Sequence, residues 1–143
     1  MPARQGIKIV PIIVGVLTES VGSVATALIL VISLAASGIP DYEILPRMHS
    51  FSGLLLSVLA NLGFTGVGGY FAGQMARQSP VLHGGIVAAV GLLLTLFCRE
   101  EGLPLWHGIL YLGGMIPAGV IGGLVAKHQY GTDGDDGKTR AHP

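Results

Sequence analysis

Glu19 is the residue whose type and position could do chemistry, because it interrupts a long run of apolar residues near the start of the chain. It follows Lys8 by eleven residues. In a helix this separation is about 16 Å, at about 1.5 Å per residue, which is near the middle of a lipid bilayer. An ionised carboxylate is costly at that depth, so the group must be protonated, paired or facing water. It could hold helices together as a neutral hydrogen-bonding group, or it could bind a cation or relay a proton.

Asn61 is the polar residue that we expect at a similar depth, about ten residues into the second apolar run. An amide can donate a hydrogen bond to a carboxyl group in either protonation state. We therefore predict a hydrogen bond between Glu19 and Asn61, assisted by Ser57 or Thr65. None of the apolar runs contains a second acidic residue, whereas proton pathways usually contain several ionisable groups. The sequence thus favours a structural role for Glu19 over a transport role.

Two histidines are weaker candidates for a functional role. His83 follows Pro80 near the start of the third apolar run, and His107 lies near the start of the fourth. We expect these positions on opposite sides of a membrane, so the two rings cannot share a metal ion. Interfacial histidines commonly bond to a loop carbonyl, which is what we expect here. Cys98 is the only cysteine, which excludes an intrachain disulfide. The sequence predicts no catalytic residue, no metal site and no cofactor.

Four apolar runs are suited to hold these side chains in a membrane, since a helix needs about 20 apolar residues to cross it. Half of the residues are hydrophobic, only 11% are charged, and the mean hydropathy is +0.66. A soluble domain carries about a quarter charged residues, so we expect lipid around this chain. The first run is about twice as long as a signal-peptide core and contains a glutamate, which favours a retained span. The sequence predicts an all-α fold, a four-helix transmembrane bundle within residues 1–130, with spans over residues 9–37, 51–76, 81–98 and 105–126, followed by a disordered tail over residues 131–143.

Lysine and arginine in the short loops predict the orientation of the spans. Six of the eight basic residues lie on one side if the spans alternate, and two lie on the other. The positive-inside rule therefore places both termini in the cytoplasm. The formal net charge is zero, so nothing indicates a nucleic-acid partner. The basic residues expected in the cytoplasm are Arg4, Lys8, Arg77, Lys127, Lys138 and Arg140, and those expected outside are Arg47 and Arg99.

Small residues repeat at helical spacing along the apolar runs, and the chain contains 23 glycines. Lipid provides no hydrophobic drive between helices, so close contact depends on small residues and on polar groups that pair. Pro117 should kink the fourth span. We expect the helices to pack, within one copy or between copies, through Gly15, Gly22, Gly69, Gly73, Gly119 and Gly123.

The second and fourth apolar runs resemble each other at an offset of 50 residues. Gly69 and Gly73 match Gly119 and Gly123, and both runs end in an alanine followed by a basic residue. A duplication would give two repeated helical hairpins related by a pseudo-twofold axis along the membrane normal. Glycine-rich helices also resemble one another by chance, so both explanations stay open.

A longer pattern carries a resemblance to known proteins. Residues 68–77 read Gly-Gly-Tyr-Phe-Ala-Gly-Gln-Met-Ala-Arg, and residues 80–84 read Pro-Val-Leu-His-Gly. This pattern resembles a group of small bacterial membrane proteins in which a glycine-rich second helix ends in Ala-Arg and a Leu-His-Gly or Leu-His-Ala element opens the third. Residues 104–106 and 117–123 look like the fourth helix of that group. The resemblance implies a four-span protein of the bacterial cytoplasmic membrane, and it brings no catalytic residues.

Two functions remain open at this point. The sequence favours a non-enzymatic membrane component that self-associates or serves as an accessory subunit, with the lipid bilayer, other copies or other membrane proteins as partners. The alternative is a small oligomeric transporter or channel for an ion or solute, with Glu19 on its path. A single bundle of this length is too small to enclose much of a cavity, so this alternative implies several copies. An enzyme acting on lipid would need a nucleophile beside a base, and the sequence shows no such combination.

Overall fold

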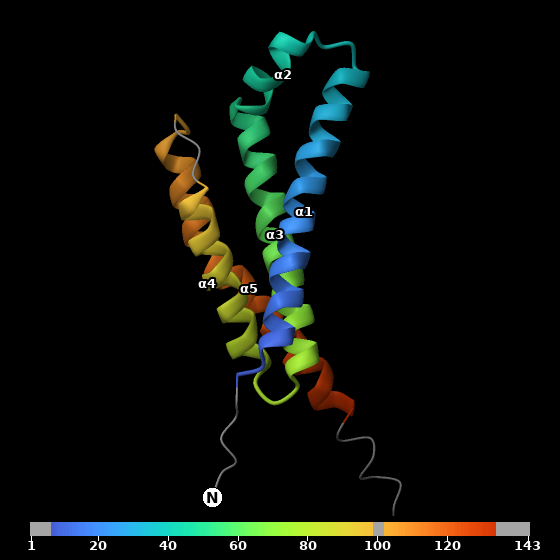
Figure 1. The fold of residues 1–143 in the computed structure, drawn as a ribbon, viewed down its shortest axis with the longest axis vertical. Coiled ribbons are helices and arrows are strands. Elements are labelled where there is room, and N and C mark those ends of the chain that lie inside the picture. Colours follow the sequence, from blue (N-terminus) through green and yellow to red (C-terminus); the bar gives the residue numbers. More distant parts are fainter. Residues whose placement is uncertain (1–6, 99–101, 134–143) are drawn as a thin grey trace, which may run out of the picture.

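The computed structural model describes residues 7–98 and 102–133, which form five helices and no strand. Four of the helices are long and apolar enough to cross a membrane. This confirms the predicted all-α fold and the four spans of a multi-pass membrane protein. The helices are α1 (Ile9–Ala36), α2 (Asp41–Met48), α3 (Phe51–Ala76), α4 (Pro80–Phe97) and α5 (Leu105–Asp133), shown in Figure 1.

The helix ends follow local signals in the sequence. Ser50 precedes α3, and its hydroxyl accepts a hydrogen bond from the Gly53 N–H at 3.3 Å, as a helix N-cap does. Pro80 begins α4, where the missing N–H of proline removes no helical hydrogen bond. Gly38 follows the end of α1 with a φ of +75°, a conformation that glycine adopts readily. As a result, the first three predicted spans agree with α1, α3 and α4 to within one residue at each end.

The short helix α2 differs from the sequence analysis, which placed no helix between the first two spans. Asp41 and Glu43 lie in its first turn and Arg47 in its last, an arrangement that suits the helix dipole. The Arg47 guanidinium also lies 3.4 Å from the Glu43 carboxylate on the exposed surface. Pro46 lies inside the helix. In so short a helix one proline removes a single backbone hydrogen bond, which the charges at the two ends help to offset.

The last helix is longer than predicted. The sequence analysis ended the fourth span at Ala126 and began a disordered tail at Gly131, whereas α5 continues to Asp133. The described helix thus includes residues 131–133, which the sequence analysis assigned to the tail. Lys127, His128 and Gln129 are compatible with a helix, and a helix can continue from lipid into water without a break. The rest of the predicted tail, residues 134–143, lies outside the described residues.

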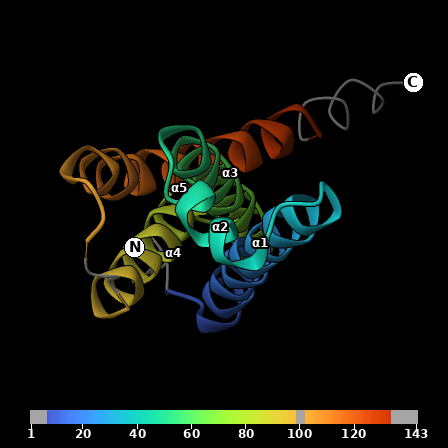
Figure 2. The ribbon, with the colours of Figure 1, turned by 90° about the horizontal axis from the view of Figure 1, so that it is seen from above.

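The helices form two hairpins, α1 with α3 and α4 with α5, and α3 packs against all three other long helices (Figures 1 and 2). We call the side that holds the start of α1 and the α3–α4 loop the terminal side. The opposite side, which holds α2 and the start of α5, is the α2 side. Figure 1 shows that the hairpins cross near the terminal side and diverge toward the α2 side. The two halves of the bundle therefore differ in how closely the helices approach.

Glycines make the close approach on the terminal side, where backbones touch directly. A Cβ atom added to Gly69 on α3 would lie 2.5 Å from the carbonyl oxygen of Gly119 on α5. One turn further, a Cβ on Gly73 would lie 3.3 Å from the Cα of Gly123. No side chain larger than hydrogen fits between helices at this distance. This close contact between α3 and α5 thus involves four of the six glycines predicted to pack helices.

The other two predicted glycines lie on α1. A Cβ on Gly68 of α3 would lie 2.5 Å from the Gly15 carbonyl oxygen, so α1 and α3 also meet backbone to backbone. Gly22 lies directly under the ring of Phe64, which fills the space that a larger residue would need. All six glycines therefore contact a second helix of the same chain.

The positions matched by the internal repeat face each other in the fold. Gly69 meets Gly119 and Gly73 meets Gly123, and α3 and α5 run in the same direction, from the α2 side to the terminal side. A twofold axis along the membrane normal would produce this arrangement. The symmetry is incomplete, because α4 packs against α3 whereas, over the described residues, α1 makes no corresponding contact with α5.

Candidate functional site

Glu19 lies in the interior of the bundle, with only 6% of its surface exposed. Its carboxyl group points from α1 toward α3 and α4. The Thr65 hydroxyl donates a hydrogen bond to Oε1 at 2.7 Å. A Cβ added to Gly91 on α4 would lie 2.5 Å from Oε2 and 2.7 Å from Oε1, so only glycine leaves room for the carboxyl group there. Oε2 has no hydrogen-bond partner among the described residues.

The predicted hydrogen bond between Glu19 and Asn61 is not formed. Asn61 instead accepts a hydrogen bond from the Ser23 hydroxyl through Oδ1, and its Nδ2 donates to the Ser57 carbonyl at 2.8 Å. The residue count in the sequence analysis placed Asn61 at the depth of Glu19. In the structure, the register of the antiparallel helices α1 and α3 places Thr65 beside Glu19 instead. The error is four residues, or about 6 Å along the helix.

The result is a short row of polar contacts between α1 and α3, with Ser23 bonded to Asn61 and Glu19 bonded to Thr65. The Thr65 hydroxyl also lies 3.0 Å from the main-chain oxygen of Asn61, which joins the two pairs. Asn61 itself adjoins an open space on the α2 side.

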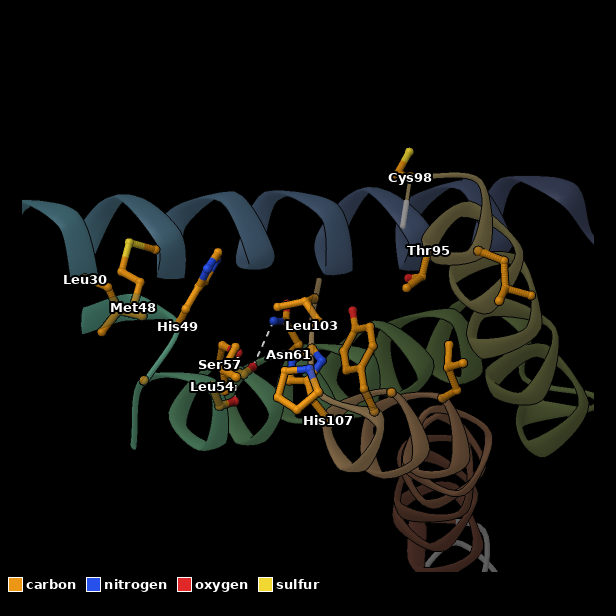
Figure 3. A pocket seen from close by; sticks show the side chains of 16 residues that line it. Leu30, Met48, His49, Leu54, Ser57, Asn61, Thr95, Cys98, Leu103 and His107 are labelled. Atoms are coloured by element: carbon orange, nitrogen blue, oxygen red, sulfur yellow. Dashed lines mark hydrogen bonds between the residues drawn. The ribbon is translucent and has the colours of Figure 1, made fainter. Parts of the chain in front are cut away.

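A cavity of about 360 Å³ opens on the α2 side, between α3 and the diverging α4–α5 hairpin. We call it the α2-side cavity. Figure 3 shows Leu54, Ser57 and Asn61 along α3, and His107 from α5 among the other side chains that line the cavity. Its apolar lining is mainly leucine, while its polar lining consists of Ser57, Asn61, Thr95, His107, Tyr111 and His49. With neutral histidines, none of the described lining residues carries a formal charge.

The floor of this cavity adjoins Glu19. Asn61 and Thr95 both line the cavity, and each lies four residues, or one helical turn, from a residue that contacts the Glu19 carboxyl group. Those contact residues are Thr65 on α3 and Gly91 on α4. Tyr111 on α5 lines the same cavity. The cavity therefore leads from the α2 side to within one turn of the buried carboxyl group.

Two aromatic contacts involve the start of α5, and the rings of the first one, His107 and Tyr111, line the cavity. The His107 ring stacks on Tyr111 with centroids 6.0 Å apart, and Trp106 packs against Phe51 at 5.1 Å. His107 thus belongs to the wall of the α2-side cavity. Cys98 also lines the cavity and is exposed.

His83 lies on the terminal side, away from His107, and is 1% exposed. Its Nε2 accepts a hydrogen bond from the main-chain N–H of Lys8 at 3.0 Å, and its Nδ1 lies 2.9 Å from the Ser79 carbonyl oxygen. These partners require the tautomer with hydrogen on Nδ1. His83 therefore ties the start of α1 to the start of α4.

Within residues 7–98 and 102–133, no three His, Cys, Asp or Glu side chains lie close enough together to hold a metal ion. The sequence analysis missed Tyr111, Thr95, Gly91 and the cavity itself. One signal was present at the start of α5 and just before it, where a proline, a histidine, a glycine, a tyrosine and a leucine recur at helical spacing and all line the cavity. Those five are Pro104, His107, Gly108, Tyr111 and Leu112.

No protein-family model, no curated protein and no solved structure matches this chain. The resemblance to four-span bacterial membrane proteins stays a prediction, as does the orientation of the termini. The function has to be inferred from the geometry of the site.

Proposed function

We propose that this multi-pass membrane protein is an ion transporter or a component of an ion channel. The transported ion binds at the carboxyl group of Glu19. The observation that carries this proposal is the unpartnered Oε2 of a carboxyl group buried in a membrane-spanning helix. Ionisable residues inside membrane spans commonly mark ion or substrate paths. The α2-side cavity would be the access route, and in the predicted orientation it opens away from the cytoplasm.

A purely structural role for Glu19 fits the contacts less well. An ionised carboxylate needs several donors, whereas the described residues supply only the Thr65 hydroxyl. A protonated carboxyl group has an O–H that needs an acceptor, and Gly91 offers no side chain beside Oε2. A buried polar atom without a partner costs about 1–3 kcal/mol. A small cation bound at Oε2 would supply the interaction that the protein does not.

The contacts also weaken two of the sequence arguments against transport. The glycines that suggested self-association are used inside one copy, at the α1–α3 and α3–α5 contacts. A single copy also contains a cavity of about 360 Å³, because its two hairpins diverge. A non-enzymatic accessory role keeps no specific support in the packing of this chain.

The test is ion flux through the full chain reconstituted in liposomes, with proton, Na⁺ and K⁺ gradients imposed in turn. We expect the unmodified chain to carry at least one of these ions, and Glu19→Gln to reduce that flux to the level of empty liposomes. Glu43→Gln is the matched control, because Glu43 lies on exposed α2 and pairs only with Arg47 among the contacts seen.

Flux that survives in Glu19→Gln would remove Glu19 from the mechanism. The absence of any flux of the three ions through the unmodified chain would refute the proposal itself.

A further inference from the structure

We infer that the α2-side cavity binds a small organic monocation with an apolar or aromatic body, attracted by the carboxylate of Glu19. This inference rests on the proposed function, because it names a ligand class for the same site. The cation would occupy the cavity itself, one helical turn from the carboxyl group.

The size and the lining of the cavity suit such a ligand. Its volume of about 360 Å³ lies within the range of about 300–1,000 Å³ that is typical of small-molecule sites. Leucines from α1, α3, α4 and α5 line the cavity together with six polar residues, of which Asn61 and Thr95 lie at the floor. A sugar or another strongly polar solute would lose hydrogen bonds to water that this lining cannot replace. An apolar or aromatic body is favoured instead.

The charge of the ligand follows from the groups nearest the floor. None of the described lining residues is formally charged when the histidines are neutral, and the Glu19 carboxyl group contacts residues that lie one helical turn from Asn61 and Thr95. One helical turn is about 5.4 Å, a distance at which opposite charges attract strongly away from bulk water. The Tyr111 ring also lies in the wall and offers a face for a cation–π contact. A cation therefore gains two attractions there, and an anion would be repelled.

The number of positive charges on the ligand follows from the charge of Glu19. An ionised Glu19 carries one negative charge, so it can compensate one positive charge. A dication would keep an uncompensated charge in a largely apolar cavity, which is unfavourable.

The first experiment measures binding to the unmodified full chain in lipid nanodiscs, by equilibrium dialysis, with empty nanodiscs subtracted. The probe is benzyltrimethylammonium, which has an aromatic body and one permanent positive charge. Neopentylbenzene has nearly the same shape without the charge, and benzenesulfonate has an aromatic body with a negative charge. We expect saturable binding of one benzyltrimethylammonium per chain and no saturable binding of the other two.

Two variants locate the site. Gly108 lies in the middle of the α5 face that lines the cavity, and a Cβ there would have no atom within 4 Å. Gly108→Phe should fill the space and abolish binding of the probe. Gly113→Phe is the control, because Gly113 has the same free space but does not line the cavity. Glu19→Gln should weaken binding at least about tenfold, since it removes the charge that attracts the cation.

The outcomes separate this inference from the proposed function. If the probe does not bind while Glu19-dependent ion flux is present, the ligand assignment is overturned and the proposed function stands. Equal binding of neopentylbenzene, or undiminished binding to Glu19→Gln, also overturns it. The comparison of the three probes uses the unmodified chain, so it decides the matter even if a variant fails to fold. Loss of both flux and binding in the unmodified chain would overturn both proposals.

Discussion

The two halves of the α3–α5 pair differ in how closely the helices pack, and the difference follows the size of the side chains along one face of each helix. On α3 the stripe at four-residue spacing passes from Ser57 and Asn61 on the α2 side to Gly69 and Gly73 on the terminal side. The helices touch where the glycines lie and enclose a cavity where the larger polar residues lie. The same two helices thus pack tightly in one half and leave an open cavity in the other.

On α5 the equivalent stripe shows the same change, from His107 and Tyr111 to Gly119 and Gly123. In the middle, Thr65 on α3 and Met115 on α5 are both fully buried. Side-chain volume along the facing sides of α3 and α5, rather than hydrophobicity, therefore determines where these two helices meet and where they separate.

The largest expected effect comes from breaking the glycine contact. Gly69→Leu should destabilise the fold by about 3 kcal/mol or more, because the new side chain meets the backbone of Gly119. The measurement is the unfolding of the purified chain in mixed micelles, followed by circular dichroism as denaturing detergent increases. Gly63→Leu is the control on the same helix, since a Cβ at Gly63 has no atom within 4 Å. Equal stability of the two variants would contradict the role assigned to the contact.

A smaller effect is expected from His83, which holds two helix ends together on the terminal side. His83→Ala leaves the Lys8 N–H without the acceptor seen in the structure. Losing this hydrogen bond and leaving the space of the buried His83 ring empty should together cost about 2 kcal/mol in the same unfolding assay. His128→Ala serves as the control, since His128 is exposed. If both alanine variants unfold at the same detergent fraction, His83 does not stabilise the helix packing on the terminal side.

A structural feature could be predicted from the sequence where it depends only on residues that are close together in the chain. The lengths of the apolar runs predict α1, α3 and α4 closely, because crossing a membrane depends on consecutive residues. The burial of Glu19 follows in the same way. Its partner could not be predicted, because the choice between Asn61 and Thr65 depends on the register of two helices that are joined by α2. The cavity depends on where two hairpins cross, which no single run of residues encodes.

The smallest expected effect concerns the polar row between α1 and α3. Replacing Ser23 by alanine and Asn61 by leucine, singly and together, forms a double-mutant cycle. We expect a coupling energy of about 0.6 kcal/mol, as is usual for hydrogen bonds between membrane helices. The same unfolding assay measures it. A coupling of zero would show that the Ser23–Asn61 hydrogen bond does not stabilise the protein.

The position of the glycine contact along α3 has a mechanical consequence. Gly69 lies 18 residues after Phe51 and 7 residues before Ala76. At about 1.5 Å per residue, the two arms of the helix are therefore about 27 Å and about 10 Å long. Two rods that touch at such a point form a lever with unequal arms. A small rotation where Gly69 meets Gly119 would move the cavity walls through a much longer arc than the terminal side.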